Sequence, residues 1–288
     1  MTATDLRTNA FRSTSVRPGP IGLVTEAIRE TLSRRRLIRY LVQADLKKKG
    51  ADTLLGNLWW VLDPLLQMAV YVVLVTVIST RSQPDYPLFI FSAILPWKWF
   101  TSSVNDAIVS VTSQERLIKQ IHFPKIVLPI AAAGAAVANF AFGLIALGLL
   151  LVAFYASRAA PTLLLIPLIA LVQFTFTLAL ALVVAAINVF YRDVGNVSRH
   201  VLRLWFYLSP ALYSTAQIHK LAESSPIVGH LMSLNPFAVL FESYRAVIYE
   251  GLPPDWSGLI RLLLVSIVLV ALATVVFKRL EPAFAKVL

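Results

Sequence analysis

Residues 126–155 read IVLPIAAAGAAVANFAFGLIALGLLLVAFY, a run of 30 positions without one charged side chain. About 20 apolar residues in a helix are enough to cross the hydrocarbon core of a bilayer. The whole chain has a similar character, with 58% hydrophobic and 14% charged residues among 288, whereas roughly a quarter of the residues in soluble domains are charged. The sequence therefore predicts an all-α polytopic membrane protein.

Five further windows on either side of this stretch have the length and apolar character of a membrane span. Two of them are interrupted. The second span carries Pro96 near its middle, which predicts a broken or kinked helix, and the fifth contains Ser209-Pro210. Pro282 is expected to end the last helix soon after its span. The six predicted spans are roughly 57–79, 87–110, 126–155, 163–190, 197–218 and 258–277.

The distribution of lysine and arginine predicts that both termini lie in the cytoplasm, because cytoplasmic flanks of spans collect these residues. With an even number of spans, 20 of the 26 Lys and Arg residues fall on the inside. Residues 1–20 are expected to be a disordered cytoplasmic tail, since they are polar and carry no apolar core of a cleavable signal. Residues 21–56 are predicted to hold a basic amphipathic helix on the membrane surface. The six-span domain then covers 57–277, and 278–288 form a cytoplasmic tail.

Several kinds of chemistry are excluded by the composition. The chain has no cysteine, and its four histidines show no metal-ligand spacing. It has no Gly-x-x-x-x-Gly-Lys-Ser/Thr loop for ATP phosphates and no Asp-x-Asp pair for a sugar nucleotide. We therefore expect no metal or cofactor in this chain. Its net charge of +11 lies between apolar runs, so we expect no nucleic-acid partner.

A set of motifs in order along the chain resembles the ABC-2 type permeases that export polysaccharides. The likeness is to the O-antigen and teichoic-acid permeases of Wzm type, and within them to actinobacterial galactan-precursor exporters. The motifs are Arg39-Tyr40 to Lys47, Leu55 to Pro64 with Leu-Gly-Asn-Leu-Trp-Trp, Arg116 to Pro129, Asn188 with Tyr191-Arg192-Asp193-Val194, and Asn235-Pro236 with Glu242, Tyr244 and Arg245.

This resemblance implies a half-transporter in the bacterial plasma membrane. Two copies of the chain would form a homodimer and would bind two copies of a separate ATPase subunit, which holds ATP and Mg. The substrate would be a glycan linked to a polyprenyl diphosphate. Two alternatives stay open: an ABC-2 permease for another amphiphile, such as a drug or a lipid, and a secondary carrier.

Residues 114–123 are predicted to form a short cytoplasmic helix that couples ATP hydrolysis to the pore. Leu117, Ile118 and Ile121 would form an apolar stripe, and an exposed stripe of this kind needs a partner. The alternative is a helix that rests on the membrane surface. The predicted coupling residues are Glu115, Arg116, Leu117, Ile118, Lys119, Ile121, His122 and Phe123.

The candidates for the substrate path are aromatic or charged residues near span ends and interruptions. Flat aromatic faces suit sugars, although an ordinary aromatic belt would place tryptophan at the same depths. Asn235 is expected to cap a helix that starts at Pro236 and continues through 237–249, as a re-entrant gate or as a surface helix that shields the bundle. The candidates are Trp59, Trp60, Asp63, Trp97, Lys98, Trp99, Asn235, Glu242, Tyr244 and Arg245.

A cluster of cations near the N-terminus is suited either to the diphosphate of the substrate or to anionic lipid, which attracts each such charge by about 1 kcal/mol. For Asp63, six residues into a span, the alternative to a substrate role is a purely structural ion pair. Small residues at 131–138 predict close packing by another helix. The cationic candidates are Arg34, Arg35, Arg36, Lys47, Lys48 and Lys49.

Overall fold

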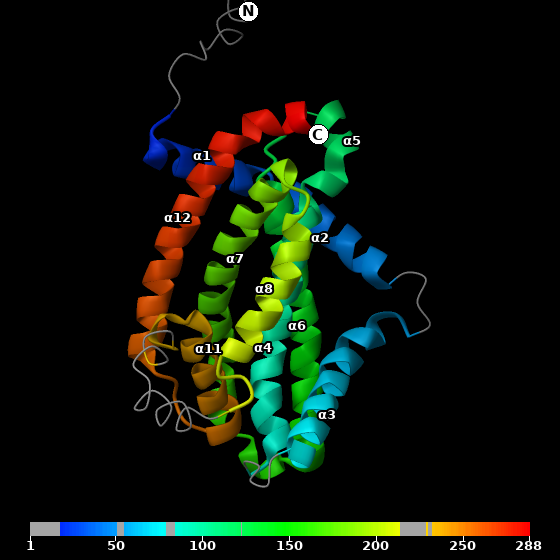
Figure 1. Cartoon of the computed structure of the whole chain (residues 1–288), viewed down its shortest axis with the longest axis vertical. Coiled ribbons are helices and arrows are strands. Elements are labelled where there is room, and N and C mark those ends of the chain that lie inside the picture. The colour runs from blue at the N-terminus through cyan, green and yellow to red at the C-terminus, as the bar shows by residue number, and fades with distance from the viewer. Residues whose placement is uncertain (1–17, 51–54, 79–83, 122, 214–228, 230–231) are drawn as a thin grey trace, which may run out of the picture.

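The computed structural model describes residues 18–50, 55–78, 84–121, 123–213, 229 and 232–288, and this part of the chain is helical, without strands. Most helices lie side by side along the long axis (Figure 1). Four are long and apolar enough to cross a membrane: Trp59–Val77, Val127–Phe154, Pro161–Phe190 and Trp256–Val287. The chain is therefore a multi-pass membrane protein. Residues 1–17 of the predicted tail lie outside the described residues.

The helices of the bundle follow the predicted windows closely where the sequence is uniformly apolar. Their bounds are α3 (Trp59–Ile78), α4 (Tyr86–Ser110), α6 (Val127–Phe154), α7 (Ile166–Phe190), α8 (Val194–Leu208) and α12 (Trp256–Val287). Shorter elements flank them: α1 (Pro20–Ser33), α2 (Arg35–Gly50), the 3₁₀ turn η2 (Thr112–Gln114), α5 (Glu115–Gln120), α11 (Pro236–Arg245) and the π-helical η5 (Ala246–Glu250).

Helix α4 is the centre of the bundle and packs against α3, α6, α7, α8 and α11. Of the two outcomes predicted for Pro96, the break is wrong, because α4 continues as one helix from Tyr86 to Ser110, and the kink stays a prediction. The side chain of Gln173 in α7 donates a 2.7 Å hydrogen bond to the Pro96 carbonyl. A neighbouring helix thus bonds the backbone near the proline, as membrane proteins require where a helix is perturbed. α4 is also not among the four apolar candidates.

Helix α8 is shorter than the predicted fifth span. It ends at Leu208, and Ser209 has an extended backbone with ψ 154°, which is the conformation favoured before a proline such as Pro210. Its 15 residues extend over about 22 Å, less than the hydrocarbon thickness of about 30 Å. Residues 214–218 of the predicted window lie outside the described residues.

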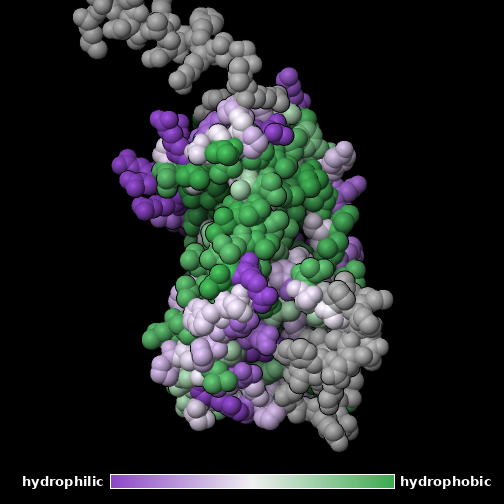
Figure 2. Space-filling view, turned by 90° about the vertical axis from the view of Figure 1, so that its left-hand side faces the viewer, coloured by the Kyte–Doolittle hydropathy of each residue, from purple (hydrophilic) through white to green (hydrophobic). Residues whose placement is uncertain are grey.

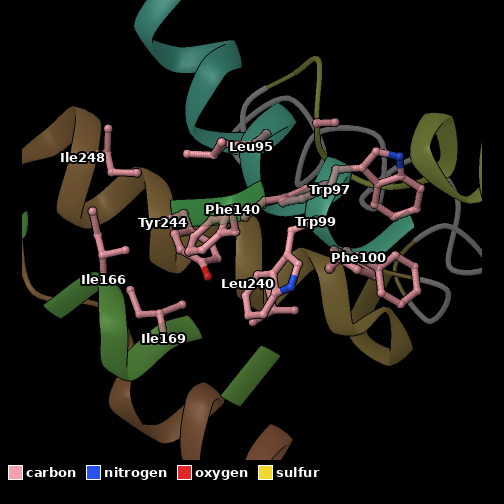
Figure 3. Packing of buried hydrophobic residues seen from close by; sticks show 14 of the residues in the cluster. Leu95, Trp97, Trp99, Phe100, Phe140, Ile166, Ile169, Leu240, Tyr244 and Ile248 are labelled. Atoms are coloured by element: carbon pink, nitrogen blue, oxygen red, sulfur yellow. The ribbon is translucent and has the colours of Figure 1, made fainter. Parts of the chain in front are cut away.

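An aromatic core joins α4, α8 and α11. Trp97 and Phe100 of α4 lie 4.7 and 4.6 Å from the Phe237 ring of α11, measured between ring centroids. Trp205 of α8 meets Phe237 edge-on at 5.5 Å. Figure 3 shows part of this core, with Trp99 next to Leu240, Tyr244 on one side of Trp99 and Phe100 on the other. Such aromatic pairs fix the relative positions of the three helices.

The small residues of α6 allow close packing inside one protomer. Gly134 faces Val42 of α2, and a Cβ at Gly134 would lie 3.5 Å from a Val42 methyl. Gly143 faces Leu95 of α4, and a Cβ there would lie only 2.1 Å from Leu95 Cδ1. The close helix packing predicted for 131–138 is confirmed at Gly134, and Gly143 extends it beyond the predicted stretch.

The predicted N-terminal amphipathic helix is two helices, α1 and α2, separated by a turn at Arg34. At the other end of the chain, the expected stop at Pro282 is wrong, because α12 continues through Pro282 to Val287.

Helix α12 has an exposed apolar face, which includes Leu264, Val268 and Leu272. Figure 2, which faces this side of the molecule, shows a broad hydrophobic band with hydrophilic residues beyond it in both directions along the long axis.

Candidate functional site

Two predicted residues from different helices form an ion pair. Lys98 of α4 contacts Asp63 of α3 through its ammonium group. The Asp63 side chain is 63% exposed and that of Lys98 27% exposed, so the pair lies on a face of the bundle that remains open in one protomer. Asp63 and Lys98 lie within predicted membrane spans, where either charge without a partner would be energetically costly. The ion pair provides each charge with its partner.

The tryptophans on either side of Lys98 point into the core. Trp97 and Trp99 are only 5% and 2% exposed, and the Trp99 ring stacks on Phe140 of α6 at 4.6 Å. Their faces are covered by other rings in this conformation, so neither is open to a sugar. Trp59 at the start of α3 is exposed, while Trp60 packs edge-on against Phe142 at 4.9 Å.

Asn235 joins α8 to α11. Its side-chain oxygen accepts a 3.0 Å hydrogen bond from the Phe237 backbone and a 3.1 Å bond from Trp205 Nε1. Its amide nitrogen donates to Ser209 Oγ at 2.9 Å. The predicted cap is therefore confirmed, with Pro236 as the first residue of the helix. The same side chain also holds the end of α8 against α11.

A cavity of about 720 Å³ lies between α11 and α12, next to the end of α8. Asn235 and Glu242 line it together with Arg261 of α12. Tyr244 and Arg245, predicted alongside them, point into the protein and are buried. Arg245 donates to the carbonyls of Ala211 and Tyr213, at 2.5 and 3.3 Å. α11 therefore presents Glu242 to the cavity and uses Arg245 to hold the chain after α8.

The coupling helix predicted over 114–123 is shorter in the structure, because α5 ends at Gln120 and Ile121 has an extended backbone. Only part of its apolar stripe is exposed. Ile118 and Phe123 are buried, each 6% exposed, in a cluster that contains residues of α6 and α12. Leu117 packs against that cluster, while Ile121 is 54% exposed. Arg116 is also exposed. His122 lies outside the described residues. The surface offered by this segment therefore consists of Arg116, Ile121 and their exposed neighbours.

Lys119 holds α5 to the C-terminus of the chain. Its ammonium donates to Glu115 at 2.6 Å and to the Leu288 backbone oxygen at 2.7 Å. The hydrogen bond from Lys119, together with its charge, lowers the pKa of Glu115 below its ordinary value of 4.5. Glu115 therefore stays ionised at neutral pH.

An ion cluster that the sequence did not predict lies where α1, α12 and the α5–α6 connection meet. Lys278 contacts Glu30 at 2.8 Å, Glu281 at 3.3 Å and Glu26 at 3.4 Å, and its side chain is 9% exposed. Glu281 also accepts a 2.6 Å bond from the Lys125 backbone. The available signal was the spacing of Glu26 and Glu30 at i, i+4 and of Lys278 and Glu281 at i, i+3, which places each pair on one helix face.

Residues 36–249 match a protein-family model described as ABC-2 type transporter. The chain belongs to the ABC-2 type transporter family. It is 37% identical over 261 residues to a protein of Myxococcus xanthus called O-antigen export system permease protein RfbA, covering 90% of this chain and 98% of that protein. Two Klebsiella pneumoniae proteins of the same description are 26% and 25% identical, each covering 88% of this chain and 95% of theirs.

This ABC-2 transporter subunit carries its predicted cationic cluster on α2 and on the turn residue Arg34 before it, near the start of the family match. The structure divides the cluster into two kinds of residue. Lys49 pairs with Asp45 at 2.9 Å and with Asp106 of α4 at 2.7 Å, so its charge is already neutralised. The remaining five cations are exposed: Arg34, Arg35, Arg36, Lys47 and Lys48.

Proposed function

We propose that this chain is the permease subunit of an exporter that moves a polysaccharide linked to a polyprenyl diphosphate across the bacterial plasma membrane. The observation that carries the proposal is the 37% identity to a protein called an O-antigen export permease, which extends over 98% of that relative. The similarity covers 90% of this chain, and the family match over 36–249 includes the proposed gate and coupling segments.

In this proposal the chain crosses the membrane six times with both termini in the cytoplasm. The four apolar helices are α3, α6, α7 with the 3₁₀ turn η4 (Pro161–Leu165) that precedes it, and α12. α4 supplies a further crossing within the protein, and α8 begins the remaining one. α1, α5 and the C-terminus lie together at one end of the molecule (Figure 1), which supports a single cytoplasmic end rich in Lys and Arg.

Two copies of the chain would form the pore, and two copies of a separate ATPase subunit would bind ATP and Mg. The absence of a phosphate-binding loop from the sequence supports a separate subunit. Arg116 and Ile121 of the α5 segment are the proposed contacts for that subunit. Because Ile118 and Phe123 anchor the segment in the core near α12, a push on α5 would be transmitted directly to the helices of the bundle.

The proposed gate lies at the C-terminal end of α8, where Asn235 bonds Ser209 and where Asn235 and Glu242 line the cavity beside α11. The Asp63–Lys98 pair would line the path of the substrate from the open side of α3 and α4. Trp97 and Trp99 support this arrangement through packing, because both are buried.

Depletion of the protein in its own cells tests the proposed substrate. A lipid-linked polysaccharide should accumulate on the cytoplasmic side and disappear from the surface, and the unaltered gene should restore export. Accumulation of a different amphiphile, with normal surface glycan, would instead support a drug or lipid permease. The purified chain should hydrolyse no ATP alone, and the partner ATPase should be stimulated in the complex.

A further inference from the structure

A second pocket, of about 290 Å³, lies between α3, α4 and α8. Arg199 and Arg203 line its side on α8, and no carboxylate is among its lining residues. The two arginines are one helical turn apart, so their Cα atoms differ in height by about 6 Å. Both side chains are exposed toward the pocket side of the bundle rather than buried in the core.

Among the residues that the structure describes, none neutralises the charge of this pocket. Arg199 donates to the Gly195 carbonyl at 3.2 Å and to the Asn196 side chain, both uncharged groups of its own helix. Arg203 makes no hydrogen bond or ion pair with any residue in the described part of the chain. The carboxylates of Asp63 and Asp106 are paired with lysines.

The lining of the pocket changes along α8 from cationic to aromatic side chains. Tyr71 and Tyr207 line it beyond the arginines, and Tyr207 lies about 12 Å from Arg199 by helical rise. Tyrosine rings offer an apolar face and a hydroxyl, a combination that suits sugar rings. A ligand with an anionic group at one end and sugars at the other would therefore fit this pocket in one orientation.

We propose that Arg199 and Arg203 form a binding site for the phosphate groups of the exported lipid-linked glycan. Guanidinium groups bind phosphate oxygens in a forked, charge-assisted geometry, and two of them provide one fork for each phosphate of a diphosphate. A bound anion would also neutralise cations that are otherwise costly between membrane helices. The identity of the ligand rests on the proposed function, whereas the anion site rests on the pocket itself.

The test uses the full-length chain with its ATPase in nanodiscs of phosphatidylcholine and measures binding of geranylgeranyl diphosphate. The variants are Arg203→Gln, the double variant Arg199→Gln/Arg203→Gln, and Arg203→Lys, with Arg279→Gln on the exposed end of α12 as the control. We expect about tenfold weaker binding for Arg203→Gln and about a hundredfold for the double variant, since charged hydrogen bonds are lost. Arg203→Lys should retain part of the affinity, and Arg279→Gln should bind as the unaltered chain does.

Competitors distinguish the possible sources of the anion. Geranylgeraniol, which lacks phosphate, should not compete, and phosphatidylglycerol should compete far more weakly than the diphosphate. Equal affinity of the double variant, or equal competition by the alcohol, would overturn the anion site. Equal competition by phosphatidylglycerol would assign the pocket to bulk lipid and overturn the substrate assignment. Loss of the dimer in the double variant, measured by light scattering, would overturn the site in favour of a subunit contact.

The outcome is independent of the export experiment. If depletion leaves surface glycan unchanged but the double variant loses diphosphate binding, the proposed function fails and the anion site stands. If depletion blocks export and the double variant binds normally, the proposed function stands and this site is refuted.

Discussion

Lys278 of α12 donates a 2.8 Å hydrogen bond to Glu30 of α1, joining two residues 248 positions apart in the chain. Glu281, one turn further along α12, contacts the same ammonium and also accepts a bond from the Lys125 backbone. One lysine therefore holds together the first helix, the last helix and the start of α6. In the proposed orientation all three elements lie at the cytoplasmic end, next to α5.

Replacing Lys278 with Met should destabilise the protein, because three carboxylates would remain together without their cation. We expect a loss of about 2 kcal/mol, below the value for fully buried pairs since two partners are partly exposed. Thermal unfolding in detergent measures it, with Arg279→Met as the control on the exposed neighbouring position. Equal melting temperatures of the two variants would contradict a stabilising role.

The same cluster predicts a dependence on high pH. Burial opposes the charge of Lys278, but the hydrogen bond to Glu30 and the charges of Glu281 and Glu30 outweigh burial and raise its pKa above 10.5. A raised lysine pKa stabilises the fold below the unfolded pKa, and this contribution is lost as pH rises through the folded pKa. The stability difference between the unaltered chain and Lys278→Met should therefore be constant near neutrality and shrink above pH 10.5.

Asn235 should be sensitive to the loss of its side chain. Asn235→Ala removes the cap of α11 and both bonds to α8, and we expect about 2 kcal/mol of destabilisation. Asn235→Asp keeps the oxygen that accepts from Phe237 and Trp205 and loses only the donor to Ser209. Its melting temperature should fall between those of the Ala variant and the unaltered chain. Identical behaviour of the two variants would show that the cap and the Trp205 bond contribute nothing.

Two glycines of α6 provide a matched pair of substitutions. A Cβ at Gly143 would meet Leu95 at 2.1 Å, whereas nothing lies within 4 Å of a Cβ at Gly148. Gly143→Ala should therefore lower stability by about 1–3 kcal/mol, the usual range for overpacking, and Gly148→Ala should not. Equal melting temperatures would mean that Leu95 moves aside without cost.

Coupling to the ATPase should depend on the exposed part of the α5 segment. Ile121→Glu places a charge at a position that is 54% exposed, so folding should survive while binding or stimulation of the ATPase is lost. Ile121→Leu, which keeps an apolar side chain, is the control. Stimulated ATP hydrolysis and export at the unaltered rate in the Glu variant would refute this docking role. They would favour contact of the stripe with the membrane surface.

A charge exchange tests the pair on the open face of α3 and α4. Lys98→Asp and Asp63→Lys should each reduce glycan export by about tenfold, corresponding to about 1.4 kcal/mol of lost interaction. The double exchange should recover export if pairing is what the path requires. Export by the double variant that is no better than by either single variant would show that one residue acts on its own.

The sequence predicted best what depends on local, uniform character. The apolar window 126–155 became α6 within a residue at each end, and the Asn235-Pro236 cap formed because its bonds are made within one helical turn. Proline effects were predicted less well. Pro96 and Pro282 both lie inside continuous helices. Gln173 of α7 bonds the Pro96 carbonyl, and the Lys125 backbone bonds the side chain of Glu281 next to Pro282. A prediction from the sequence of one helix does not include such contacts with neighbouring segments.

The candidate site shows the same division between local and distant relationships. The choice of Asp63 and Lys98 as notable charges required only hydropathy, but their pairing depends on how α3 packs against α4. The burial of Trp97 and Trp99 could not be predicted either, because a tryptophan beside a lysine in a helix is equally compatible with an exposed belt. The cluster around Lys278 combines residues 248 positions apart, which no local pattern specifies.

The most direct test of the proposed function is transport by the complex in sealed vesicles with its ATP sites on the outside. Lipid-linked glycan is supplied in the outer leaflet, and its transfer to the interior is measured by protection from an added glycosidase. The account predicts protection that requires ATP, this chain and its ATPase together. Absence of protection while the complete complex hydrolyses ATP, or equal protection without ATP, would contradict it.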